Sequence, residues 1–389
     1  MRWRPVAYTA VGLASVLVLG VSGYAWTQVS KLTDGLATAD VIEPAAQLPS
    51  TPDVPVPEQN ILLVGIDSRT DAQGDPLSQN VLDQLHAGDG SDGGDTTDTM
   101  IVVHIPAGGG EATAISIPRD SYVQIAGGYG KHKINAAYSY GKQAARTELA
   151  KQGVTGAARE RQADQAGART AIQTVESFTG LTINHYAAVN LLGFYTLSMA
   201  VGGVPVCLKE PVHDSYSGAS FPAGQQTLSG AQALAFVRQR HGLADGDLDR
   251  IARQQAFLSS AAKVVLAAGT LANPVKLGNL IAAVQQSVLI DSGWDILTFA
   301  QQMRGLSSDG LTFATIPVQS LSLQTPGDGD AVKVDPVQVR SFIQELLGKT
   351  TTSSSPGVDA QAAESSAPPT TVTSLVPSAN TTELSGCVD

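Results

Sequence analysis

Four arginines stand close together in a chain whose formal net charge is -11. Arg238 and Arg240 close one predicted helix, and Arg250 and Arg253 fall in the first turns of the next. Arg250 and Gln254 are four residues apart and therefore share a helix face. The planar guanidinium fork matches phosphate oxygens in pairs, so the group favours an anion-binding site. Surface ion pairs with neighbouring aspartates are the structural alternative.

A second set of polar residues stands at the ends of predicted strands. Asp67 follows an apolar run, Asp98 enters the second strand, and Arg119 leaves the third. Ligand crevices of open α/β sheets gather at strand ends, and magnesium binds one or two carboxylates together with substrate phosphates. Asp67 and Asp98 therefore predict a Mg²⁺ site. A turn or capping role for Asp67, and an ion pair of Arg119 with Asp120, remain alternatives.

Other kinds of chemistry lack their signatures in the sequence. No His/Cys group has the spacing of a zinc site, and neither a G-x-S-x-G elbow nor a P-loop occurs. His132, between Lys131 and Lys133, is a candidate for lining a phosphate site. The acidic net charge argues against nucleic acid as a partner, because such binding depends on a basic surface.

The elements that position these residues form one domain, predicted over residues 60–348. Short apolar runs predict strands, and a Pro-Ala-Gly-Gly-Gly turn joins two of them as a hairpin. Strands and helices interleave, which predicts an α/β fold with a mixed central β-sheet flanked by helices. The predicted strands are residues 61–66, 100–105, 112–117, 204–208 and 311–318. The predicted helices are residues 134–140, 163–179, 189–201, 229–238, 248–268, 273–290, 294–306 and 335–347. Residues 70–97 read as a long surface loop.

The N-terminus predicts a single membrane anchor. Residues 1–5 carry two arginines, and residues 6–26 are apolar without one charge. About 20 apolar residues span a bilayer, and arginines before the span keep that end in the cytoplasm. We therefore expect a single-pass protein of the cell membrane with its domain outside, although a cleaved signal peptide is the rival interpretation. Residues 27–59 read as a proline-rich linker.

The C-terminus predicts a disordered tail over residues 349–389, rich in Ser, Thr and Pro. The tail ends in Cys387, and the other cysteine of the chain is Cys207. Export places both where disulfides persist, and two cysteines allow one intramolecular bond. The alternative is a buried free thiol at Cys207 and an exposed one at Cys387.

The chain resembles the LytR-CpsA-Psr family of cell-wall assembly proteins, and its composition resembles actinobacterial members. The resemblance covers residues 60–320 and rests on several motifs. These are NILLVGIDSR (60–69), DTM (98–100), SIPRD (116–120), KINAAY (133–138), DSYSG (214–218), FPAG (221–224) and TLSGAQALAFVRQRHGLADGDLDRIARQQ (227–255). It implies a sheet flanked by helices with an apolar tunnel for a polyprenyl chain. It also implies transfer of a glycopolymer phosphate from a polyprenyl diphosphate carrier to a peptidoglycan hydroxyl, usually with magnesium.

The resemblance also implies roles for individual residues. Asp67 and Asp98 would hold the metal, and Asp98 or Asp67 would accept the hydroxyl proton. The diphosphate would be bound by Arg119, Arg238, Arg240 and Arg250, with Gln254 completing the pocket and Lys133 a weaker candidate. Residues 70–97 form a longer spacer than is usual in the family, which leaves the placement of Asp67 against Asp98 open.

Other functions share part of this pattern. A lipid diphosphate phosphatase would use the same pocket with water as the acceptor. A transcriptional regulator is opposed by export and acidity, and a non-catalytic wall-binding scaffold would not need the arginines. The sequence does not name the glycopolymer, although the actinobacterial resemblance favours arabinogalactan or a related polymer.

Overall fold

The computed structural model describes residues 35–43, 57–89, 95–239, 241–243, 247–266, 274–295, 299, 311–348 and 387–389. Its centre is a seven-stranded mixed sheet in the order β1-β12-β7-β2-β3-β4-β13. Three neighbouring pairs are parallel (β1 with β12, β7 with β2, β4 with β13), and the other three are antiparallel (β12 with β7, β2 with β3, β3 with β4). The strands are β1 (Ala37–Ala39), β2 (Gln59–Ile66), β3 (Thr97–Ile105), β4 (Ala112–Ser116), β7 (His185–Asn190), β12 (Val288–Asp291) and β13 (Leu311–Thr315).

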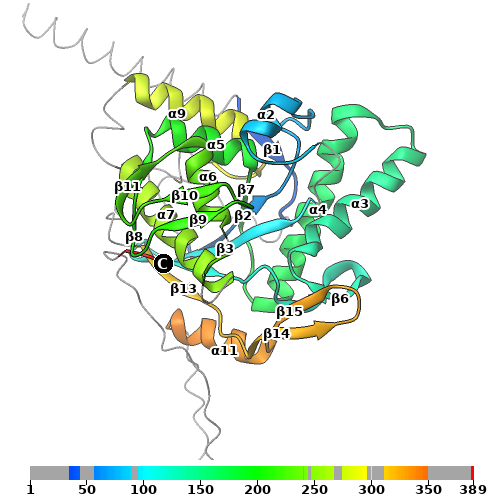
Figure 1. Ribbon diagram of the computed structural model, residues 1–389. Helices are drawn as coiled ribbons and strands as arrows, with labels where there is room; N and C mark the ends of the chain where they lie inside the picture. The colour runs from blue at the N-terminus through cyan, green and yellow to red at the C-terminus, as the bar shows by residue number, and fades with distance from the viewer. Residues whose placement is uncertain are drawn as a thin grey trace, which may run out of the picture.

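Helices cover the sheet on two sides (Figure 1). One group holds α3 (Ala136–Lys151), α4 (Gly156–Thr179) and α11 (Pro336–Leu346). The other group holds α5 (Leu191–Ala200), α6 (Gly230–Arg238), α7 (Asp247–Leu266) and α9 (Pro274–Ser287), with the short α2 (Gln79–Gln84) beside it. The mixed central sheet flanked by helices is therefore as expected from the sequence.

Side-chain alternation along β2 explains why both faces are covered. Leu62 and Val64 are buried in the core cluster that contains α3 and α4 residues. Ile61 and Leu63 point to the opposite face, where the cluster of Ile61 includes Trp294 and that of Leu63 also includes Leu258 of α7. Because successive side chains of a strand point to opposite faces, a continuous apolar run can be buried only between two helical layers.

Small antiparallel pairs surround this framework. They are β5 (Tyr122–Ile125) with β6 (Gly130–Lys133), β8 (Val204–Leu208) with β11 (Gly224–Leu228), β9 (Val212–Asp214) with β10 (Ala219–Phe221), and β14 (Ser320–Thr325) with β15 (Gly329–Lys333). A short 3₁₀ turn, η2 (Ala126–Gly128), joins β5 to β6. The pair β9–β10 presents a turn at the site described below.

The predicted linker is partly wrong. Residues 37–39 form β1 at the edge of the sheet, and Val41 and Ile42 are 4% and 5% exposed in the main core. The short Ala-Thr-Ala segment has no periodicity that would predict a strand. Its burial depends on pairing with β12, which is distant in sequence. The predicted anchor at residues 6–26 lies outside the described residues, and no helix within them is long and apolar enough to span a membrane.

Several element boundaries also differ from the prediction. The helix predicted over residues 273–290 ends at Ser287, and Val288–Asp291 becomes β12. The helix predicted from residue 189 starts at Leu191, after the Asn190 side chain accepts a hydrogen bond from Gly193 N. The predicted loop over residues 70–97 contains α2 and the first residue of β3. In the first two cases a short apolar segment is shared between two adjacent elements, which periodicity does not divide.

The last three residues are placed on the domain rather than in a free tail. Cys387 forms a disulfide with Cys207 of β8, with a Cα–Cα distance of 4.4 Å. Val388 N donates to Cys207 O at 2.9 Å, and Lys209 N donates to Val388 O at 2.8 Å. Residues 349–386 of the predicted tail lie outside the described residues.

Candidate active site

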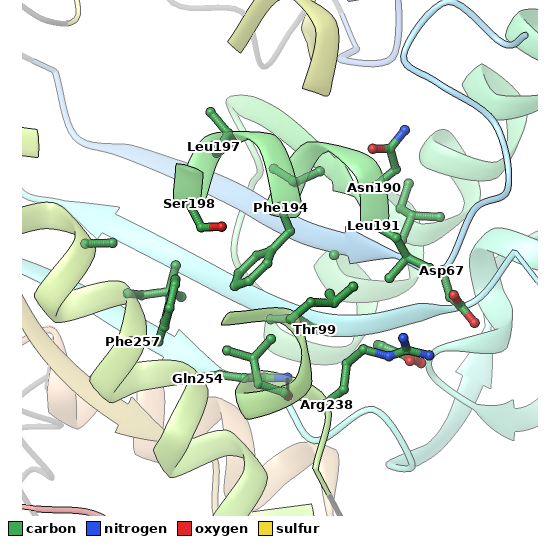
Figure 2. A pocket seen from close by; sticks show the side chains of 18 of the residues that line it. Asp67, Thr99, Asn190, Leu191, Phe194, Leu197, Ser198, Arg238, Gln254 and Phe257 are labelled. Atoms are coloured by element: carbon green, nitrogen blue, oxygen red, sulfur yellow. Dashed lines mark hydrogen bonds between the residues drawn. The ribbon is translucent and has the colours of Figure 1, made fainter. Parts of the chain in front are cut away.

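A cavity of about 610 Å³ opens between the sheet and the α5–α7 layer. Most of its wall is apolar. Figure 2 shows Asp67 and Arg238 together at one end, the polar end, and Ser198 at the other. Figure 2 shows Phe194 of α5 and Phe257 of α7 entering it from different helices, and their ring centroids are 5.0 Å apart. Further apolar lining residues are Leu63, Leu197, Leu258, Val265, Leu280 and Val284. This volume suits a single elongated apolar ligand.

The two predicted metal-binding aspartates both lie at the polar end of the cavity, which we call the mouth. Asp67 follows β2, and its backbone N donates to Thr96 O at 3.0 Å. In the β2–β3 ladder Gly65 pairs with Thr99 and Ile66 with Thr97, so Asp98 is the extra residue of a β-bulge. Bulges redirect side chains at strand ends, and this one brings Asp98 to the cavity despite the long preceding segment.

Gly65 permits the close approach of these two strands. A Cβ atom on Gly65 would lie 3.2 Å from the Thr99 Cβ and 3.3 Å from its Oγ1, which is tighter than most contacts. A side chain there would push β3 away at the residue next to the bulge. The glycine of the GIDSR motif therefore supports the geometry of the mouth.

Arg119 lies against Asp98 at the mouth. Its Nη1 donates to Asp98 Oδ1 at 2.6 Å, and its Nε is 3.5 Å from Asp120 and 3.9 Å from Asp247. Burial alone would lower the pKa of Arg119, but the carboxylates of Asp98, Asp120 and Asp247 outweigh it and raise the pKa. Arg119 is therefore a permanent cation. Asn135 links the start of β3 to the segment after β4, because its O accepts a hydrogen bond from Thr97 N and its N donates to Arg119 O.

Three further predicted residues reach the same cavity from α6 and α7. Arg238 lies at the end of α6, and its Nη1 donates to Leu85 O at 3.2 Å and His86 O at 3.4 Å. Figure 2 shows its guanidinium extending toward Asp67. Arg250 is 3% exposed and forms an ion pair with Asp247, one turn earlier. The remaining predicted residue that lines the cavity is Gln254.

The other predicted residues lie elsewhere. Lys133 does not line the cavity, and its Nζ pairs with Asp120 at 3.3 Å, so it acts on the mouth only through Asp120. His132 pairs with Asp328 at 2.9 Å, away from the cavity lining. Arg253 is fully buried and does not line the cavity. Arg240 lies outside the described residues.

The donor set at the mouth fits a cation that shares its coordination with phosphate. Within the described residues, no group of three or more His, Cys, Asp or Glu side chains could hold a metal alone. Asp67 and Asp98 each use one oxygen in an ion pair, with Arg69 and Arg119 respectively. Magnesium binds through one or two carboxylates and completes its octahedron with water and phosphate oxygens. The geometry is compatible with such a site.

Sequence reasoning missed three residues at the mouth. Asp214, Tyr216 and His241 line the cavity together with the arginines. Asp214 and Tyr216 stand in a motif that carries the family resemblance, but neither residue type nor spacing assigned them a role. A lone histidine after Arg240 gave no signal, since its partner is distant in sequence.

Comparison with known proteins gives the family. Residues 37–340 match the model of the LytR_cpsA_psr family. The chain is 46% identical over 93% of its length to the cell wall biosynthesis protein LcpA of Corynebacterium glutamicum. It is 36% identical over 80% of its length to the probable cell wall biosynthesis protein LcpB of that organism. The alignments span 69% and 64% of the lengths of these two relatives.

Solved structures share the fold. The crystal structure of Bacillus subtilis TagV has a TM-score of 0.54 at 26% identity, covering 76% of this chain and 99% of that one. A LytR-Csp2A-Psr enzyme from Actinomyces oris has a TM-score of 0.53 at 20% identity, covering 80% and 95%. With a family match over most of the domain and these shared folds, the chain belongs to the LytR_cpsA_psr family.

Proposed function

We propose that this protein transfers a glycopolymer phosphate from a polyprenyl diphosphate carrier to a hydroxyl group of peptidoglycan. The observation that carries the proposal is one cavity with an apolar interior and a mouth containing Arg119, Arg238, Arg250, Asp67 and Asp98. A lipid diphosphate has the same division, with an apolar chain and an anionic end. An apolar metabolite would not need the arginines, and a free nucleotide would not need the apolar interior.

The apolar interior provides the binding free energy for the carrier. Burial of apolar surface contributes about 25 cal/mol per Å², and the lining aromatic rings present large apolar faces to the chain. The lipid need not leave the membrane completely, since only the part nearest the diphosphate has to enter. Binding the carrier in this way orients its diphosphate at the mouth, where the reacting bond must lie.

The arginines at the mouth neutralise charge during the transfer. The acceptor hydroxyl oxygen attacks the phosphorus that carries the glycopolymer, and the bridging P–O bond breaks, so that polyprenyl monophosphate leaves. Phosphoryl transfer depends mainly on positioning and charge stabilisation, which Arg238 and Arg119 can supply as bidentate donors. Arg240 and Arg250 would add further positive charge at the same place. The hydroxyl proton passes to a carboxylate, Asp98 or Asp67.

A magnesium ion belongs to this proposal as a cofactor held by Asp67 and Asp98. When bound, it would supply Lewis-acid neutralisation of phosphate oxygens. With the cation present, the two aspartates would exchange part of their pairing with Arg69 and Arg119 for metal coordination, and the arginines would turn toward phosphate. Gln254, whose Nε2 donates to Val237 O at 3.3 Å, completes the wall between the mouth and the apolar interior.

The relatives support the reaction class. A protein of Bacillus cereus named polyisoprenyl-teichoic acid–peptidoglycan teichoic acid transferase TagU is 27% identical over 84% of this chain and 89% of its own length. The relatives named LcpA and LcpB act in cell wall biosynthesis by their names. We propose the cell membrane as the location, with residues 6–26 as the anchor and the domain outside, because both substrates of the proposed reaction are found there.

The experiment that tests the proposal uses the full-length protein in detergent with a radiolabelled polyprenyl diphosphate glycan. Label should move into peptidoglycan only when peptidoglycan and Mg²⁺ are both present. Release of a soluble phosphorylated glycan at the same rate without peptidoglycan would instead indicate a phosphatase. Binding without turnover of any kind would indicate a scaffold and contradict the proposal.

A further inference from the structure

Two aromatic rings stack at the mouth and remain largely open to solvent. Tyr216, in the turn between β9 and β10, is 80% exposed, and the His241 side chain is 62% exposed. Their ring centroids are 4.3 Å apart, and the planes are inclined by 30°. Single exposed apolar residues are common on protein surfaces, but a stacked pair from two distant segments at the edge of a cavity is an organised surface.

A buried carboxylate holds this pair in place. Asp214 is 3% exposed, and its Oδ1 accepts a hydrogen bond from Tyr216 N at 2.9 Å. Its Oδ2 accepts from Ser217 Oγ at 2.8 Å, which fixes the turn that carries the tyrosine. The same Oδ1 is 3.7 Å from His241 Nδ1. Burying a carboxylate is costly unless it is well bonded, so the turn that carries Tyr216 has a rigid support, and His241 lies within ion-pair distance of the same carboxylate.

The pair adjoins the phosphate-binding arginines. A Cβ atom on Gly218, in the same turn as Tyr216, would lie 3.6 Å from the ring of His86. The carbonyl of His86 accepts a hydrogen bond from Arg238. Tyr216, His241 and Arg238 all line the same cavity. A group attached to a phosphate bound by Arg238 would therefore meet these two rings.

We propose that Tyr216 and His241 form a subsite for the sugar ring attached directly to the phosphate of the donor. The inference rests on the proposed function, because it identifies what lies beyond the diphosphate. The sugar cannot enter the apolar interior, since its hydroxyl groups would lose their hydrogen bonds with water there. At the mouth, one C–H-rich face of a pyranose can pack on the phenol ring while its hydroxyl groups remain solvated or bond to the imidazole.

The acceptor glycan is a less suitable occupant of this subsite. In an in-line displacement the acceptor hydroxyl approaches the phosphorus from the side opposite the leaving group. On its way it must pass the groups that receive its proton. Those groups are Asp67 and Asp98, which follow β2 and start β3. Tyr216 and His241 come instead from the β9–β10 turn and from the segment after α6, and neither is a carboxylate that could receive the proton.

The test compares two ligands that differ by one sugar. Binding to the full-length protein in detergent is measured for a short prenyl diphosphate and for the same lipid diphosphate carrying one N-acetylglucosamine or one glucose. Tyr216→Ala should weaken binding of the sugar-bearing ligands by about fivefold to tenfold, the size expected for one aromatic contact. The affinity for the bare prenyl diphosphate should stay within about twofold of wild type. A twofold change corresponds to less than half of the binding free energy expected for the aromatic contact.

Two controls make the result decisive. Tyr216→Phe keeps the ring and should bind both ligands as wild type does, and circular dichroism with thermal unfolding should show that both variants fold. Equal weakening of both ligands by Tyr216→Ala, or no weakening of either, would overturn the subsite while the proposed function stands. Failure of the wild-type protein to bind the bare prenyl diphosphate would instead remove the proposed function, and the subsite with it.

Discussion

Two regions of this molecule place cations against several carboxylates, and they differ in what the charges face. Between α3 and α4, Lys142 is 1% exposed, and its Nζ lies 2.7 Å from Asp164 and 2.9 Å from Asp95. Arg146 donates from Nε to both oxygens of Glu160 at 3.0 Å. None of these side chains lines the cavity. At the mouth, Arg119, Arg238 and Arg250 instead face space large enough for a ligand.

The difference distinguishes a structural ion network from a candidate binding site. Lys142, at the centre of the α3–α4 network, is enclosed by protein, and Tyr138 Oη adds a hydrogen bond to Asp164 at 2.8 Å. Burial raises the pKa of the Lys142 partner Asp164, and the nearby Lys142 ammonium opposes that rise. The charges at the mouth can exchange partners when an anion arrives. We therefore expect substitutions in the first region to change stability and those in the second to change activity.

The largest expected effect is on transfer, from Arg238→Ala. Loss of a charge stabiliser in the transition state should lower the transfer rate by about 10²–10³-fold. The unfolding midpoint should change little, because the lost contacts are two hydrogen bonds to carbonyls at the end of α2. The measurement is the radiolabel transfer assay together with thermal unfolding.

Arg340 of α11 offers a matched control for this substitution. Its guanidinium also donates to two carbonyls at a helix end, Phe178 O and Ser177 O, but on the other side of the molecule from the cavity. Arg340→Ala should keep full activity. Equal activity in the two alanine variants would show that the mouth is not the site of charge stabilisation.

A somewhat smaller effect is expected for Asp98→Asn. Losing several kcal/mol of metal-dependent stabilisation of the transition state should lower the transfer rate by about 10²-fold. In the wild type, chelation should lower activity and added Mg²⁺ should restore it, while the variant should respond much less. Asp330→Asn, on the exposed β14–β15 pair, is the control and should respond as wild type does. An unchanged metal response in Asp98→Asn would exclude Asp98 from the metal site.

The enclosed network gives the third prediction. Lys142→Met leaves Asp95, Asp164 and Glu160 without their central cation, which should lower the free energy of unfolding by about 3–5 kcal/mol. Lys151→Met on the same helix is the control, because Lys151 forms an exposed pair with Glu148 and such pairs contribute about 0–1 kcal/mol. Denaturant unfolding measures both. If Lys142→Met were as stable as Lys151→Met, the contrast between the two regions would fail.

Much of the mouth could be predicted from the sequence, because its residues follow strand and helix ends. Asp67, Asp98 and Arg119 are fixed by short-range rules about where a strand stops. The β-bulge at Asp98 was not predictable, since it depends on how β2 and β3 pair across a long intervening segment. Likewise, the stack of Tyr216 on His241 brings together two segments distant in sequence that meet at the buried Asp214.

The α3–α4 network shows a second limit of sequence reasoning. Lys142 and Arg146 stand on a polar helix and look like solvated charges, yet Lys142 is almost fully buried. The cause is helix packing: a Cβ on Gly141 would lie 2.7 Å from Ala166 O, so the two helices approach closely there. Charge density in the sequence therefore indicated arginines that line the cavity but not this network, because only packing decides which charges are enclosed.

Arg253 belongs to the arginine-rich segment of the sequence, but in the structure it is an enclosed charge, as Lys142 is. It is fully buried, its guanidinium carbon lies 5.2 Å from the centroid of the Phe236 ring, and it donates to Gln239 and to the backbone O of Asp389. Burial lowers its pKa to about 10 despite the nearby Asp249 and Asp389 carboxylates. Asp389 is therefore a partner of a buried arginine of α7 that does not line the cavity.

The smallest expected effect follows from removing the bond that holds this C-terminus. Cys387→Ser should lower the free energy of unfolding by about 2–4 kcal/mol, less than a chain-entropy estimate for so long a loop, and Cys207→Ser should match it because both remove one bond. Transfer at low temperature should stay close to wild type, since Arg253 does not line the cavity. Mass spectrometry of the non-reduced digest should show one peptide pair joining Cys207 to Cys387. Two alkylatable thiols would refute the bond, and a transfer loss as large as that of Arg238→Ala would place Arg253 and the C-terminus with the binding arginines instead.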